Sequence, residues 1–133
     1  MTKAILFILL LSFWAVVYCN IKSELNAENW ENEPTLKKVV PVGVKGVAAF
    51  LKKAFPKQVG KGNPKLKKVL KIENQTVAGT NFWLEMLLVA GSQVFKCSRV
   101  VVHQPFVFSC KEESLCLEYL SDSGAYEHQC SLV

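Results

Sequence analysis

Apolar and polar positions in this chain change their spacing near Pro56. From Val44 to Phe55 the apolar side chains recur every three or four residues, and the lysines fall away from that stripe. This period predicts one amphipathic helix, which must end at Pro56 because proline cannot continue it. Beyond it, apolar and polar residues alternate, which predicts strands over 68–74, 81–89 and 94–103 and a shorter one over 115–120. Short turns between strands favour an α+β fold, with one N-terminal helix packed across an antiparallel β-sheet meander.

The first 19 residues differ in character from the rest. Lys3 is followed by an uncharged run from Ala4 to Val17, a pattern typical of a secretory signal peptide over 1–19 that is cleaved after Cys19. A retained membrane anchor is the alternative. Cleavage would leave a secreted, extracellular chain with no further segment long enough to cross a bilayer, and loss of Lys3 would lower the formal net charge from +5 to +4. Residues 20–42 are polar and without period, so we expect an extended or disordered arm with a short helix near 25–30 as an option, followed by one domain over 43–133.

Cysteine spacing limits the chemistry that the chain can perform. Cys97, Cys110, Cys116 and Cys130 remain after cleavage, and an even count in a small exported chain indicates two disulfides in one of three connectivities. There is no CxxC pair, and the spacings fit no zinc site, so we expect neither a metal nor another cofactor. The two histidines have no nucleophile at a catalytic spacing, which argues against an enzyme.

Two short motifs lie where the predicted strands turn. Gln75-Thr76-Val77-Ala78-Gly79 separates the first two strands, and Pro105-Phe106 follows the third, eight residues after Cys97. Together with the helix upstream, this order resembles the secreted, disulfide-bearing branch of the cystatin family over roughly 44–120. That family carries Gln-x-Val-x-Gly in one hairpin and Pro-Trp in the next, and Phe106 stands here in place of the Trp.

The resemblance implies a monomeric, reversible, tight-binding inhibitor of papain-like, cathepsin-type cysteine proteases. Its two hairpins would plug the active-site cleft with the following protease-binding residues: Gln75, Thr76, Val77, Ala78, Gly79, Pro105 and Phe106. The residue chemistry agrees, because Gly79 tolerates the positive φ of a tight tip. Val77 and Phe106 would supply apolar area, the latter on a turn stiffened by proline.

Other features go beyond or depart from the family pattern. The resemblance ranks Cys97–Cys116 with Cys110–Cys130 first among the disulfide pairings, and it offers no counterpart for the tail over 121–133. Residues 20–42 contain no glycine, so no hinge-dependent arm contact is assigned. Asn74-Gln75-Thr76 is an N-glycosylation sequon; a glycan on Asn74 would lie beside the hairpin tip, and an unused sequon is the equal alternative.

A second function class rests on the lysines. Residues 57–71 hold six Lys and no acid, which indicates either a solvated loop leading into a strand or a surface for anionic partners. No aromatic residues are interleaved to stack on bases, so we do not expect nucleic acid as the partner. The alternative to the inhibitor is therefore a non-inhibitory, cystatin-like secreted binding or host-defence protein that uses this Lys-rich face.

Overall fold

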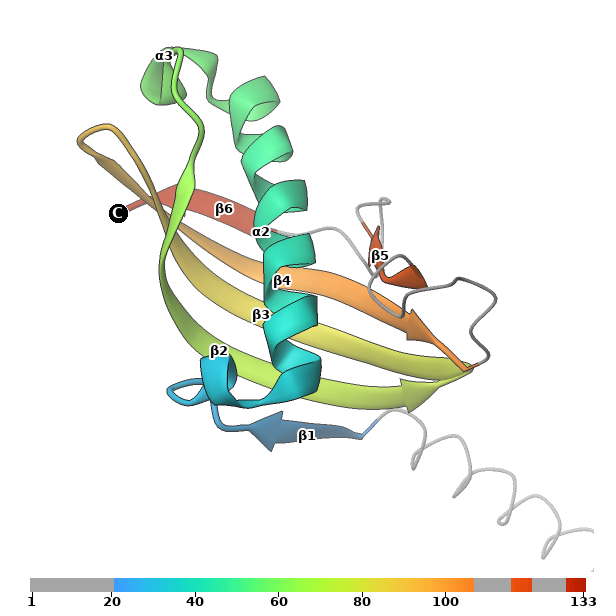
Figure 1. The fold of residues 1–133 in the computed structure, drawn as a ribbon. Helices are drawn as coiled ribbons and strands as arrows, with labels where there is room; N and C mark the ends of the chain where they lie inside the picture. The colour runs from blue at the N-terminus through green and yellow to red at the C-terminus, as the bar shows by residue number, and fades with distance from the viewer. Residues whose placement is uncertain (1–20, 107–115, 121–128) are drawn as a thin grey trace, which may run out of the picture.

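One antiparallel sheet curves around one long helix in this protein (Figure 1). The computed structural model describes residues 21–106, 116–120 and 129–133. The elements in chain order are β1 (Lys22–Leu25), the 3-10 turn η1 (Trp30–Asn32), α2 (Pro34–Ala54), α3 (Pro56–Val59), β2 (Lys65–Val77), β3 (Gly79–Ala90), β4 (Gln93–Pro105), β5 (Glu118–Leu120) and β6 (Gln129–Leu132). The strand order is β1-β2-β3-β4-β5, and β6 also pairs with β4. The predicted α+β fold, with a helix across an antiparallel meander, is confirmed.

Helix α2 begins at Pro34 rather than at Val44, so the predicted boundary at residue 43 falls inside it. Proline at the first helical position suits a helix start, because its missing N–H would be unpaired there anyway. Pro41 lies inside the helix on its exposed side. The predicted end is confirmed, since the Phe55 N–H donates to the Leu51 carbonyl at 2.8 Å just before Pro56.

The described residues 21–33 correct the prediction of an arm. Lys22–Leu25 is a strand that pairs with β2, so the extended part is fixed to the sheet and is not a disordered segment. The optional helix near 25–30 is replaced by the short 3-10 turn at Trp30–Asn32. The N-terminal end of the described chain therefore adds a fifth backbone ladder to the meander.

The core lies between α2 and the sheet face that it covers. Alternate residues of β3 from Phe82 to Leu88 are buried on this face, as their period predicts. The helix contributes a buried stripe of Leu36, Val39, Val40, Gly43, Val47 and Leu51. A Cβ on Gly43 would lie 2.7 Å from the Leu84 Cδ1 atom, so this glycine lets the helix approach the sheet closely.

A bulge in β4 keeps both halves of that strand facing the core. The register passes from Leu84↔Val100 to Met86↔Cys97, which leaves Arg99 as an extra residue with φ 57°. An inserted residue changes which positions face inward, so Cys97 and Val100 are both buried although their spacing is odd.

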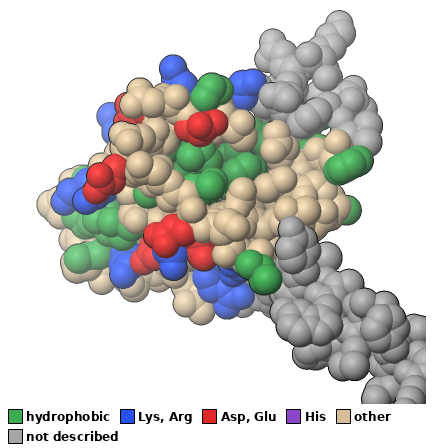
Figure 2. Space-filling model, turned by 90° about the horizontal axis from the view of Figure 1, so that it is seen from below, with side chains coloured by type: hydrophobic (Ala, Val, Ile, Leu, Met, Phe, Trp, Pro, Cys, Tyr) green, Lys and Arg blue, Asp and Glu red, His purple; other side chains and the backbone are tan. Residues whose placement is uncertain are grey.

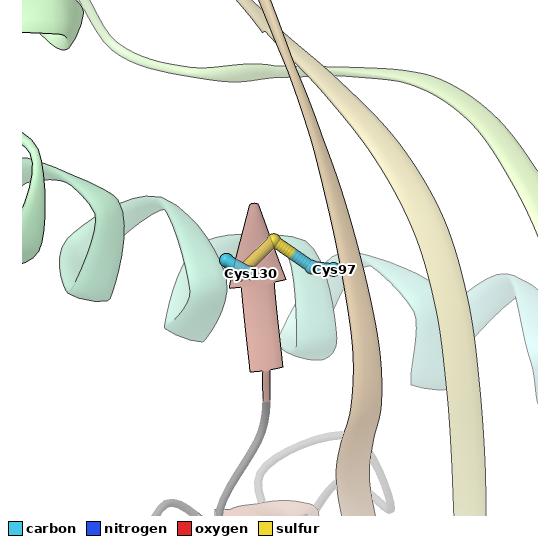
Figure 3. Close-up of a disulfide and its surroundings, with 2 residues drawn as sticks. All are labelled: Cys97 and Cys130. Atoms are coloured by element: carbon cyan, nitrogen blue, oxygen red, sulfur yellow. A yellow bond between two sulfur atoms is a disulfide. The ribbon is translucent and has the colours of Figure 1, made fainter. Parts of the chain in front are cut away.

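The disulfide pairing differs from the ranking that the resemblance implied. Cys97 on β4 is bonded to Cys130 on β6, and the two are also cross-strand partners in the sheet (Figure 3). The ranked Cys97–Cys116 and Cys110–Cys130 pairs are therefore wrong, because β6 places Cys130 beside Cys97. Cys116 is also disulfide-bonded.

Several predictions fall outside the described residues. These are the signal peptide over 1–19, Cys110, and the part of the tail over 121–128. The described end of the tail is strand β6, so this segment has a structural role in the sheet. Within the described ranges, no helix has the length and apolar character needed to span a bilayer.

Candidate functional site

The β2–β3 hairpin ends in a very tight tip. Val77 pairs with Gly79 across the hairpin, so Ala78 is the single residue at its apex. Thr76, Val77 and Ala78 are exposed, whereas Gly79 is half-buried with φ 110°. Glycine adopts this backbone conformation without the steric cost that a Cβ imposes, which explains why it follows the apex.

Pro105-Phe106 lies directly beside this tip. Gly79 is the cross-strand partner of Pro105, at the last rung of the β3–β4 ladder. A Cβ on Gly79 would overlap the Gln104 carbonyl oxygen and would lie 2.9 Å from the Phe106 backbone nitrogen. The absence of a side chain at residue 79 is what allows the two predicted motifs to meet.

Ile21 brings a third segment to the same edge of the sheet. Lys22 pairs with Gln75, so Ile21 comes next in the antiparallel direction, level with Thr76. Its side chain is 54% exposed, compared with 37% for Val77 and 82% for Phe106. Three exposed apolar side chains from three separate segments therefore lie along one end of the sheet. In the described part of the chain, the other exposed large hydrophobic residues are Leu132, the last residue of β6, and Val133 after it.

Trp83 holds the N-terminal strand and the hairpin together on the sheet face away from α2. Its indole Nε1–H donates to the Gln75 Oε1 atom at 3.0 Å. The Lys22 ammonium lies 3.7 Å from the centre of the Trp83 ring, a cation–π contact. Gln75 is thus bonded to a neighbouring side chain behind the tip and supports the hairpin from there.

A second cross-strand bond supports the neighbouring ladder on the same face. The His103 Nδ1 and Asn81 Oδ1 atoms lie 2.7 Å apart, linking β4 to β3 two rungs from Gly79. Asn81 is only 2% exposed, and buried polar groups are normally hydrogen-bonded, so this bond satisfies it. His103 therefore has a structural partner close to the tip.

Asn74 of the sequon points to the opposite face, toward α2. It is half-buried near the end of β2, between Ser23 of β1 and Phe82 of β3. It lines a pocket of about 600 Å³ between the start of α2 and the sheet. Figure 2 shows hydrophobic side chains gathered near the centre of this side of the molecule, with polar ones around them. Asn74 therefore lies on the helix side of the sheet, three positions before Val77 in the chain.

The structure brings all the predicted tip residues together, from Gln75 to Gly79 and on to Pro105 and Phe106. Sequence reasoning missed Ile21, Trp83 and Asn81, and the polar pattern around Ile21 carried no signal that would have found it. Among the described residues, no cluster of His, Cys, Asp or Glu could hold a metal ion. Comparison with protein-family models finds no match, and comparison with curated protein sequences finds none either.

Proposed function

We propose that this chain is an exported, monomeric, reversible inhibitor of papain-like cysteine proteases. In this proposal the hairpin tip at Val77–Gly79 and the Pro105-Phe106 turn enter the active-site cleft together, and Ile21 contacts the cleft beside them. The observation that carries the proposal is the convergence of three exposed apolar side chains on one sheet end. Export rests on the apolar segment that follows Lys3.

Apolar burial supplies the driving force. Phe106 is 82% exposed in the free chain, and covering an aromatic side chain of this kind contributes about 2–3 kcal/mol. Large aromatic residues near the centre of an interface commonly dominate its affinity. The smaller Val77 and Ile21 would add area at its sides, and the backbone around Gly79 would approach the cleft closely because no side chain intervenes.

Rigidity of the edge lowers the entropic cost of binding. The tip is held by the β3–β4 ladder through Gly79 and Pro105, and by the bond from Trp83 to Gln75. Lys22 on the Trp83 ring fixes strand β1, which begins directly after Ile21. A surface that is already in its bound conformation has less freedom to lose on association.

The same geometry explains why the chain would inhibit and not be cleaved. A papain-like enzyme attacks a peptide carbonyl with a cysteine thiolate while the substrate lies in its groove. Here both sides of Ala78 are immediately tied into a ladder, at Val77 and Gly79. The apex therefore cannot lie extended past the nucleophile, so we expect competitive inhibition with no covalent bond.

The test compares two exposed apolar residues at opposite ends of the described sheet. Phe106→Ala should weaken the inhibition of papain at least about 30-fold, which corresponds to about 2 kcal/mol for an interface anchor. Leu132→Ala, which removes an exposed side chain on β6, should leave the inhibition constant unchanged. The measurement is the inhibition constant against a fluorogenic peptide substrate, with and without enzymatic deglycosylation of the inhibitor.

Two results would contradict the proposal. One is unchanged papain activity at micromolar concentrations of the unmodified chain. The other is an equal loss of inhibition in both variants, because the tip would then have no special role. Deglycosylation that restores a missing inhibition would instead place a sugar on Asn74 in the path of the protease.

A further inference from the structure

Seven lysines form a charged surface at the end of the molecule away from the hairpin tip, here called the lysine end. They lie on the last turn of α2, on α3, in the following loop and at the start of β2: Lys52, Lys53, Lys57, Lys61, Lys65, Lys67 and Lys68. All seven are exposed. Figure 1 shows these three elements side by side at the top of the view, far from the tip of the β2–β3 hairpin.

No acidic side chain of the sequence interrupts this surface from within. Residues 34–72 contain no Asp or Glu. Lys71 and Lys96 lie outside the lysine end and pair with Glu73 and Glu85, whereas none of the seven has an ion pair in the described part of the chain. The backbone N–H of Val133 donates to the Val94 carbonyl of β4. Strands β3 and β4 therefore separate Val133 from the lysines at the start of β2. Among the described residues, this surface therefore carries concentrated positive charge that no carboxylate pairs with.

We propose that the lysine end binds a linear sulfated polysaccharide. Lysine ammonium groups act as point charges for sulfate and do not need the planar fork that arginine provides. The seven residues come from three elements that lie side by side, an arrangement that a linear polyanion can follow from one element to the next. Single-stranded nucleic acid would call for aromatic stacking platforms, and the exposed large hydrophobic residues of the described chain include no aromatic at this end.

Distance makes this surface compatible with protease binding. Lys65 and Val77 stand at the two ends of β2, a strand of 13 residues, which spans on the order of 40 Å. Lys65 also pairs with Val89, at the end of β3 that lies away from Gly79. A polysaccharide on the lysine end would leave the tip free, so the inhibitor could be held on a sulfated matrix while it binds an enzyme.

Heparin serves as the probe, with a matched pair of charge variants. Lys65→Gln/Lys68→Gln should weaken heparin binding about tenfold, and the slope of log affinity against log salt should fall by about 1.5, because two charge contacts are lost. Lys22→Gln/Lys37→Gln removes the same charge outside the lysine end, on β1 and the start of α2, and should change neither value. Equal loss in the two variants would overturn the proposal, since net charge alone would then explain retention. So would equal or tighter binding to phosphatidylserine vesicles or to duplex DNA at the same salt concentration.

Simultaneous binding of heparin and protease is the one part of this inference that rests on the proposed function. Papain with its nucleophilic cysteine replaced is passed over heparin beads that carry the unmodified chain. Retention of the enzyme supports simultaneous binding. If the chain fails to bind heparin but inhibits papain in solution, only the polysaccharide proposal is wrong; if it binds heparin and never captures or inhibits papain, only the inhibitor proposal is wrong. An enzyme that is captured in solution but not on the beads would show that the two surfaces exclude each other.

Discussion

Gly79 is the residue on which the joining of the two hairpins depends most directly. We expect Gly79→Ala to destabilise the protein and to abolish tight inhibition together. The φ of 110° is one that alanine adopts only with strain, which costs about 1–3 kcal/mol. The new methyl group would also overlap the Gln104 carbonyl and press on the Phe106 backbone, and an added methyl in a packed site costs a further 1–3 kcal/mol or so.

Gly91 offers a matched control in the other hairpin, between β3 and β4. Its φ is 61°, and a Cβ there would meet nothing within 4 Å. Gly91→Ala therefore carries backbone strain of about 1–2 kcal/mol without the contact. The difference between the two variants measures how closely the Gly79 backbone and the Gln104–Phe106 strand approach each other.

Urea unfolding followed by circular dichroism gives the free energy of unfolding of both variants, and papain inhibition is measured under conditions where each is folded. We expect Gly79→Ala to be the less stable by about 1–4 kcal/mol, with inhibition weakened at least about 30-fold. Gly91→Ala should inhibit like the unmodified chain. Equal stability of the two variants, with inhibition intact in both, would refute the close approach of the hairpins.

Three further predictions concern residues that support the site. Gly46→Ala should lower the free energy of unfolding by about 1–2 kcal/mol, because its Cβ would lie 2.6 Å from the Tyr119 Cδ2 atom, and this outweighs the gain of about 1 kcal/mol in helix propensity. In a Tyr119→Ala background the same change should become stabilising in urea unfolding, and a loss of stability in both backgrounds would contradict the contact. Burial raises the pKa of Tyr119 to about 12, so the folded state keeps a proton that the unfolded state loses near pH 10. The free energy of unfolding should therefore fall by on the order of 1 kcal/mol between pH 10 and 12. Tyr119→Phe should remove this contribution to the pH dependence of stability. Removing the Cys97–Cys130 disulfide with a double alanine variant should cost about 3–4 kcal/mol, as expected for a sequence separation of 33, and a peptide map without this linkage would show that the pairing is wrong.

The sheet and the tip were predictable because their signals are local. Alternation along β3 has a period of two that only a strand with one buried face explains, and Gly79 after a run of strand formers indicates a tight turn. The helix signal from Val44 onward was equally local, but the residues before Val44 gave no helical period, so the first turns of α2 were not predicted. Proline ordinarily marks a helix boundary, and α2 carries Pro34 at its start and Pro41 inside; only packing against the sheet makes the second one tolerable.

Features that depend on partners distant in sequence were not predictable. Strand β1 is short and mostly exposed, so nothing in its own pattern distinguishes it from a polar arm; it is a strand because β2 offers a free edge. The Cys97–Cys130 bond follows from the pairing of β6 with β4, which four cysteine positions cannot specify. The hydrogen bond from Trp83 to Gln75 likewise cannot be predicted without knowing the register between β2 and β3.

Binding to papain with an open and with a filled cleft tests the central claim most directly. Calorimetric titration of the unmodified chain into catalytically inactive papain should show one-to-one binding when the cleft is empty. It should show none when a small covalent ligand already fills the cleft of the active enzyme, because the edge formed by Ile21, Val77 and Phe106 would have nowhere to enter. Equal binding to both forms, or no binding to the open one, would contradict the account.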